Sequence, residues 1–396
     1  MSDTFLLCHI GIYSTFAAIF NTDTIRDMVI KTLIPMKRLN ILLVLCVGAF
    51  ACLSAQTDST ATVKAWKFDG NIGLNATGTG LVNWTGGGKN TVNGLTFVRL
   101  HLLYDKDAIA WESDFDTDFG VSWIDQTEDR LRKASDKINF STKFGWEFRK
   151  DLYLTVLGSF QSQYIIGREI KKGYDPPISK FLAPSYTDMG IGIDWKHTVS
   201  GCDFSVFVSP VAGRITTAYV SDKLNGYYTA EHREMVPDEK DYDFRRYLQE
   251  KYGTYKIILN AEGMPDIQYN DARAEFGFFF KGTIAYKYDN MTLGSTLMLY
   301  TPYQCRGYDI KTAYEATHPG ETWDVYYRYS NLNRQFGYFD VDWDTNLSYR
   351  FAKVLNVTLS TSLKYYPGVL IADNDGVKKE RVQFKAVVGI GLGYSF

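Results

Sequence analysis

The sequence is poor in cysteine and proline and carries almost no net charge. Its 396 residues include 5 Cys and 10 Pro, and the formal net charge is -2 at pH 7. So few cysteines exclude a fold held together by a disulfide framework. A nearly neutral net charge gives no sign of the basic patch that nucleic-acid binding usually requires, so we expect no nucleic-acid partner. After residue 55, no apolar run reaches the roughly 18 residues that a membrane-spanning helix needs.

Aromatic residues and glycine are abundant instead, with 28 Tyr, 25 Phe and 33 Gly. This composition suits β-strands and the aromatic girdles of a membrane barrel. The clearest pattern is at the C-terminus, where every second residue from Val382 to Phe396 is apolar and most residues between them are polar or small. A period of two indicates a strand, and this one is about three times the usual length. Lipid on one face and water on the other is the simplest environment that explains it.

The same alternation recurs along the chain and predicts about twelve strands. They lie near residues 64–76, 92–104, 109–123, 136–149, 152–166, 186–197, 202–219, 271–288, 291–303, 337–351, 355–367 and 381–396. Their connections alternate between short and long, as in an up-and-down barrel whose short turns face the periplasm. We therefore predict an all-β fold, a transmembrane up-and-down antiparallel β-barrel in the outer membrane of a Gram-negative bacterium. A secreted sandwich is the alternative, but its sheet edges would be unprotected.

The N-terminal region has the order of segments that is typical of a secretory signal. Met36 begins a basic stretch, an apolar run follows, and small residues precede a cleavage position after Ala55. We interpret residues 36–55 as a signal peptide and residues 56–396 as one barrel domain. Residues 1–35 are then a wrongly assigned upstream start or an N-terminal extension.

Several stretches carry a resemblance to a known family. They are Asn83–Gly88, Asp136–Asn139, Phe160–Tyr164, Ile178–Tyr186 and the junction Leu53–Gln56. These stretches resemble an uncharacterised family of predicted outer-membrane β-barrel proteins from Bacteroidetes, a domain of unknown function. The resemblance implies a location and an architecture. It brings no substrate and no catalytic residue.

Two of the predicted strands carry rows of carboxylates between apolar residues. The rows are Glu112, Asp114, Asp116 and Asp118 on the third strand, and Asp340, Asp342 and Asp344 on the tenth. Residues of opposite charge on other strands are Arg99, His101, Arg273, Lys281, Lys364 and Lys385. Because rings of acidic groups favour cations, these residues predict the lumen of a channel or transporter for a small solute. The alternative is a narrow barrel in which the charges pair and nothing passes.

Other features bear on partners and on alternative functions. The longest loop, 220–270, has helical spacing at Phe244, Leu248 and Tyr252, which predicts a short helix at the mouth of the barrel. The C-terminal Leu392, Tyr394 and Phe396 resemble the signal read by the barrel-assembly machinery. The expected partners are therefore the barrel-assembly machinery, outer-membrane lipid and a candidate small solute.

Residues near the strand ends suit interfacial aromatic girdles, namely Trp66, Trp111, Trp123, Trp195 and Tyr394. No motif for a cofactor, a metal or a catalytic nucleophile is evident, so we expect neither a cofactor nor enzymatic activity. Two other functions remain as hypotheses. One is a non-transporting barrel that binds at the surface or organises the envelope, and the other is a membrane-embedded hydrolase that uses His197.

Overall fold

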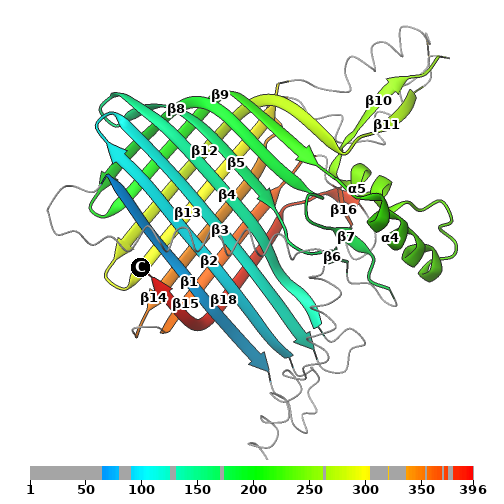
Figure 1. The fold of residues 1–396 in the computed structure, drawn as a ribbon, viewed down its shortest axis with the longest axis horizontal. Helices are drawn as coiled ribbons and strands as arrows, with labels where there is room; N and C mark the ends of the chain where they lie inside the picture. The colour runs from blue at the N-terminus through cyan, green and yellow to red at the C-terminus, as the bar shows by residue number, and fades with distance from the viewer. Residues whose placement is uncertain are drawn as a thin grey trace, which may run out of the picture. The chain divides into compact units, whose positions relative to one another are not determined.

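Twelve antiparallel strands close into a barrel in the computed structural model, which confirms the predicted fold class. The structure describes residues 65–79, 91–124, 131–169, 174–261, 265–303, 320, 336–352, 355–367, 370–372 and 378–395. The barrel strands are β1 (Trp66–Thr79), β2 (Thr91–Lys106), β3 (Ile109–Ile124), β4 (Leu131–Arg149), β5 (Leu152–Ser162), β8 (Ser185–Val199), β9 (Cys202–Thr217), β12 (Ala272–Tyr288), β13 (Met291–Pro302), β14 (Asp340–Arg350), β15 (Leu355–Tyr365) and β18 (Gln383–Ser395). Each pairs with the barrel strands before and after it in the chain, and β1 pairs with β18 to close the ring (Figure 1).

All the predicted barrel strands are present, with ends that differ by a few residues. β4 begins at Leu131 rather than at 136, and β5 ends at Ser162 rather than at 166. The physical reason for the early end of β5 lies in Asp136, whose carboxylate accepts hydrogen bonds from the backbone N–H groups of Tyr164 and Ile165 at 2.8 and 2.9 Å. The backbone of β5 therefore leaves the ladder there.

In the parts of the loops that the structure describes, there are three small sheets that the sequence did not predict. They are β6 (Gly167–Arg168) with β7 (Pro177–Ser179), β10 (Tyr255–Leu259) with β11 (Pro265–Tyr269), and β16 (Leu370–Ala372) with β17 (Lys378–Glu380). The predicted signal peptide, the motif at 83–88 and Phe396 lie outside the described residues. Cys202 is a free thiol at the start of β9.

The outer face of the barrel is apolar, as the period-two pattern predicts. On β18, Phe384, Val388, Ile390, Leu392 and Tyr394 are between 55% and 66% exposed. A closed ladder satisfies every strand's backbone internally, and an apolar exterior suits hydrocarbon. This is the fold of Gram-negative outer-membrane proteins, and it places the chain in the outer membrane. Separately, none of the helices that the structure describes is long and apolar enough to cross a membrane.

Aromatic residues gather on the outer face near the short turns. The Trp66 ring lies 4.8 Å from the Tyr104 ring and 5.7 Å from the Trp111 ring. Trp195 and Tyr394 are exposed close to the same ends of their strands. These positions fit the predicted interfacial girdle at the turn end of the barrel. Trp123 lies instead near the loop end of β3.

Two helices lie at the loop end of the barrel, between β9 and β12 (Figure 1). The predicted helix is α5 (Phe244–Tyr252). Asp243 caps its N-terminus, because the Asp243 side chain accepts a hydrogen bond from the Arg246 backbone N–H. The helix ends at Gly253, which has the left-handed conformation. Phe244 and Leu248 are fully buried against Ala183, Ala218 and Val220, close to the loop ends of β8 and β9. α4 (Asp222–Met235) precedes it and was not predicted.

A proline interrupts β9 on its lipid-facing side. The register of β9 shifts around Pro210 against both β8 and β12. The hydroxyl oxygen of Ser209 lies 2.9 Å from the carbonyl oxygens of both Ile191 and Val211 and shares its one hydrogen between them. The hydroxyl of Tyr303 donates to the Pro210 carbonyl at 2.6 Å. Side-chain hydroxyls therefore satisfy backbone groups that the bulge removes from the ladder.

Replacing Tyr303 with Phe is expected to destabilise the barrel, because the Pro210 carbonyl then lacks its donor. The free energy of unfolding should fall by about 1–3 kcal/mol. Urea unfolding in lipid vesicles, followed by tryptophan fluorescence, measures the change. Tyr349→Phe, at another exposed tyrosine on the outer face, is the matched control and should change stability by less than about 0.5 kcal/mol. Equal effects of the two substitutions would contradict the role of this hydrogen bond.

Candidate functional site

The strand register turns both predicted carboxylate rows into the barrel. On β3, Asp116 lies opposite Arg99, while the alternating Trp111 is exposed on the outer face. On β14, Asp344 lies opposite Ser362, while Trp343 is exposed. The inward side chains then form three charged groups along the lumen.

The turn-side group lies near the short turns and contains His101, Glu112, Asp114, Lys143, Asp194 and Lys196. Nδ1 of His101 lies 2.7 Å from Oδ1 of Asp114. Glu112 Oε2 lies 2.9 Å from Lys196 Nζ and 3.2 Å from Lys143 Nζ. Lys143 also pairs with Asp194 at 3.1 Å. Lys281, from β12, donates to the Ser141 hydroxyl at 2.9 Å.

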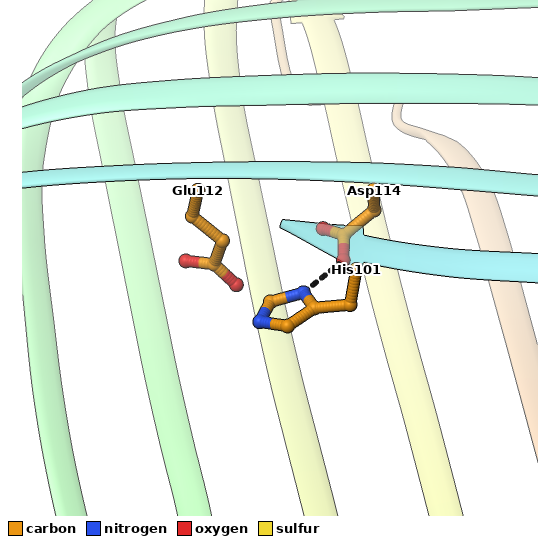
Figure 2. A group of neighbouring side chains, drawn as sticks. All are labelled: His101, Glu112 and Asp114. Carbon is orange, nitrogen blue, oxygen red and sulfur yellow. Dashed lines mark hydrogen bonds and ion pairs between the residues drawn. The ribbon is translucent and has the colours of Figure 1, made fainter. Parts of the chain in front are cut away.

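One part of this group has the side chains of a metal site. Figure 2 shows the His101 ring beside the carboxylates of Glu112 and Asp114, and their candidate ligand atoms lie within 4.8 Å of one another. However, two lysines already neutralise Glu112, and their charge would repel a divalent cation. The geometry therefore fits an ion-pair network better than a metal centre.

The central group spans the lumen and contains Arg99, Asp116, Asp118, Lys137, Asp344 and Asn346. Lys137 Nζ lies 2.9 Å from Asp116 on the adjacent strand and 2.9 Å from Asp344. β4 and β14 lie halfway round the ring from each other, so the second contact crosses the barrel. Arg99 pairs with Asp116 and Asp118 at 3.5 Å and donates to the Asn346 amide oxygen at 3.0 Å.

The loop-side group is centred on Arg214, which is almost fully buried. Its guanidinium donates to Asp188 on β8 at 2.6 and 3.0 Å and to Asp340 on β14 at 2.7 Å. The same guanidinium lies over the Tyr300 ring, 4.4 Å from its centroid. The neighbouring Asp342 accepts from Lys364 and from the Tyr366 hydroxyl, each at 2.6 Å.

Arg273, also predicted as a lumen residue, lies at the loop end rather than among these groups. It pairs with Glu275 at 3.0 Å and donates to the Gly253 carbonyl at 2.8 Å, just after α5. Lys385 donates to the Ser135 hydroxyl at 3.2 Å. Among the residues that the structure describes, neither Arg273 nor Lys385 forms a direct ion pair with a carboxylate of the predicted acidic rows.

The two halves of the lumen differ in kind. On β5, β9, β12 and β13, the side chains of Leu157, Phe207, Ala212, Phe279, Met298 and Tyr300 form a buried cluster. On β15 and β18, many inward positions carry small residues, such as Thr358 opposite Gly389 and Ser362 on β15, although Lys385 lies opposite Ser362. The central charged side chains are partly accessible to solvent, at 25% for Arg99, 23% for Asp116, 24% for Lys137 and 19% for Asp344.

Several lumen residues were not singled out from the sequence. They are Lys137, Lys143, Asp188, Asp194, Lys196 and Arg214. All but Arg214 lie on the polar parity of a predicted strand, so the alternation alone identifies those five as inward. Arg214 follows the bulge at Pro210, where the inward positions of β9 change from odd to even numbers. The alternation does not identify the ion-pair partner of each residue, because that partner lies on another strand.

His197, the residue of the hydrolase hypothesis, lies at the turn end of β8. Its Nδ1 is 3.2 Å from Oδ2 of Asp151, and its ring stacks on Trp195 at 5.6 Å. Within the described ranges, no Ser, Thr or Cys side chain is hydrogen-bonded to it. These contacts do not assemble a nucleophile with its base.

Lys180 is a buried cation at the loop end, in the turn that leads into β8. Its Nζ donates to the carbonyls of Phe181 and Tyr219 at 2.7 and 2.9 Å. Burial lowers the pKa of Lys180 from 10.5 to about 8. The Lys180 side chain therefore links the turn before β8 to the segment that follows β9. Its charge is poorly solvated in this position.

Comparisons with known proteins assign no function to the chain. Residues 77–167 match a family described as a protein of unknown function, DUF3078. The predicted resemblance to an uncharacterised family is confirmed for that segment, and the Bacteroidetes origin stays a prediction. No curated protein matches the chain.

Three solved structures illustrate the likeness. The translocator domain of the autotransporter NalP from Neisseria meningitidis is 10% identical with a TM-score of 0.29, over 89% of this chain and 95% of that one. An outer membrane channel from Pseudomonas putida F1 is 9% identical with a TM-score of 0.31, over 86% and 99%. OmpT, an outer membrane protein of Vibrio cholerae, is 9% identical with a TM-score of 0.26, over 86% and 100%. Likenesses of this size do not identify a function.

Replacing Arg214 with Met is expected to be strongly destabilising. The substitution leaves the buried carboxylates of Asp188 and Asp340 without the cation between them, which typically costs about 3–5 kcal/mol. Urea unfolding in vesicles measures the loss. Arg149→Met, at an exposed arginine at the turn end of β4, is the control and should stay within about 0.5 kcal/mol of the wild type. A loss no larger than the control's would show that the group is not a buried ion-pair network.

The lowered pKa of Lys180 predicts a pH dependence of stability. Its folded-state pKa is about 8 and its ordinary value is 10.5, so the folded state binds fewer protons between these values. Stability should therefore rise as the pH increases from about 8 towards 10.5. Lys180→Met should remove this rise while it keeps the side-chain volume. Unfolding free energies of both proteins at pH 7 and pH 9.5 give the comparison, and the same pH dependence in both would contradict the assignment.

Proposed function

We propose that the protein is an outer-membrane channel or transporter for a small solute, closed at the centre of its lumen in the state described. The observation that supports this best is the partial solvent accessibility of the central charged side chains. Arg99, Asp116 and Lys137 lie inside a closed barrel, and yet about a quarter of each side chain is exposed. Space for water therefore exists beside these side chains in the middle of the lumen.

The path follows one wall rather than the barrel axis. The aromatic cluster around Phe207, Phe279 and Tyr300 fills the opposite half as a protein core does. Along β15 and β18 the inward residues are mostly small and polar. Towards the turn end of this wall, Asn75 and Asn356 occupy the space beside Gly389, Gly391 and Gly393. A solute would pass along this small-residue wall.

The constriction is electrostatic as well as steric. Lys137 and Asp344 meet across the lumen, and Arg99 reaches Asn346 from the same side. Charged side chains at a narrow point select what passes. Glu112, Asp114, Asp116, Asp118, Asp340, Asp342 and Asp344 would act in this way together with Arg99. The role of each in selectivity stays a prediction.

A second candidate function is a barrel that transports nothing and acts through its loop end. The packed half of the lumen and the ion pairs that cross it favour this alternative. The helices α4 and α5, with their own buried contacts, would then present a binding surface. We also propose that Leu392 and Tyr394, with Phe396, form the signal for barrel assembly.

A blocking substitution tests the proposed path. Ser360 faces the lumen on β15, where its hydroxyl donates to Asn346 at 2.7 Å, and its neighbour Leu359 is exposed on the outer face. In planar bilayers, Ser360→Trp should abolish most of the single-channel conductance because the indole fills the small-residue wall. Leu359→Trp adds the same bulk on the lipid side and should leave the conductance close to that of the wild type.

The wild-type protein decides between the two functions. If purified barrel gives neither conductance in planar bilayers nor solute flux in proteoliposomes, the channel is rejected and the non-transporting barrel is favoured. If both tryptophan substitutions lower conductance equally, the path along β15 and β18 is wrong.

A further inference from the structure

The cross-lumen ion pair between Lys137 and Asp344 identifies the kind of solute, if the protein is the channel proposed above. We propose that the solute is a small organic cation with N–H donors, which binds Asp344 in exchange for Lys137. The reason lies in the ion pairs that remain within each wall of the lumen when the wall that carries Lys137 and the wall that carries Asp344 separate.

The wall that carries Lys137 remains balanced after separation. Lys137 keeps Asp116 on the adjacent strand at 2.9 Å. Arg99 keeps Asp116 and Asp118, each at 3.5 Å. Two positive and two negative side chains therefore stay together on β2, β3 and β4, and this wall needs no ion from the solute.

The wall of β14 does not remain balanced. Asp342 keeps Lys364 from the adjacent β15 at 2.6 Å, and Asn346 is neutral. Asp344, in contrast, receives its direct ion pair from Lys137 across the lumen. The adjacent β15 supplies the Ser362 hydroxyl and the more distant charge of Lys364, which is paired with Asp342. Lys385 on the neighbouring β18 donates to Ser135 at 3.2 Å. Opening the constriction between Lys137 and Asp344 therefore leaves Asp344 without a cation in direct contact.

A carboxylate without such a contact is costly in a narrow lumen, so the constriction opens most easily when another cation replaces Lys137. An anion would meet Asp344 with like charge, and a neutral solute would leave it unpaired. An ammonium or guanidinium group supplies both the charge and the N–H donor that Lys137 Nζ places 2.9 Å from Oδ2 of Asp344. Arg214, shared between Asp188 and Asp340, repeats the arrangement nearer the loops.

Uptake into proteoliposomes tests this inference with three solutes of similar size and different charge. The probes are radiolabelled ethanolammonium, glycolate and glycolamide, which are a cation, an anion and a neutral molecule. Wild-type barrel should take up ethanolammonium at least about tenfold faster than the other two. Folded protein is confirmed first by its heat-modifiable migration in gels.

Variants locate the preference. Asp344→Asn should bring the cation-to-neutral uptake ratio close to one, and Asp344→Glu should keep it well above one. Lys137→Gln removes the bridge and leaves Asp344, so it should raise ethanolammonium uptake several-fold while the preference persists. Asp342→Asn is the matched carboxylate on the same strand and should lower the ratio less, because Asp342 is paired within its own wall.

The outcomes separate this inference from the function on which it rests. If neither the wild type nor Lys137→Gln takes up any probe, the channel itself is rejected. If uptake occurs but is the same for cation, anion and neutral probe, the channel stands and the cation inference is overturned. If Asp342→Asn and Asp344→Asn lower the ratio equally, Asp344 is not the binding residue.

Discussion

The structure depends on closure of its backbone ladder, because a strand edge left open in hydrocarbon has no partner for its N–H and C=O groups. The closing pair is β1 with β18, in register from Asn71 opposite Ser395 to Asn75 opposite Gly391. Glycine at 391 is required there, since a Cβ would lie 2.2 Å from the Leu74 carbonyl oxygen. The space above it lets Asn75 reach across β18 to the Thr358 hydroxyl at 2.8 Å. Backbone pairs and a side-chain bond therefore close the ring together.

Much of this fold is visible in the sequence, because the determinant of a membrane strand is local. Polar and apolar residues alternate within each strand, so the strands and the inward direction of the Asp116 and Asp344 rows follow from parity. Helix α5 follows in the same way from the spacing of Phe244 and Leu248. The aromatic cluster did not follow, because Phe207, Phe279 and Tyr300 face inward against the polar-inside pattern of a barrel.

The partners of the lumen charges could not be predicted for a different reason. Lys137 and Asp344 are 207 residues apart in the chain. Whether they meet depends on the diameter of the ring and on the stagger of its strands, which no single strand encodes. The acidic rows therefore suggested a negatively charged lumen, whereas each group in the structure also contains lysine or arginine. The physical picture changes from a charged wall to opposed walls that neutralise each other.

Closure of the lumen and cohesion of the barrel are provided by the same contacts. Asp340, Asp344 and Asn346 on β14 accept from side chains on β9, β4 and β2 respectively. A single strand thus receives cations from three other strands, and its displacement would release all three contacts together. After this release, Lys137, Arg99 and Arg214 each remain paired with a carboxylate on an adjacent strand, so most of the charges stay paired. The interactions that hold the lumen shut are therefore ones that a competing cation could replace without leaving many buried charges unpaired. The same ion pairs would then determine both which solute the channel admits and how stably its walls are joined.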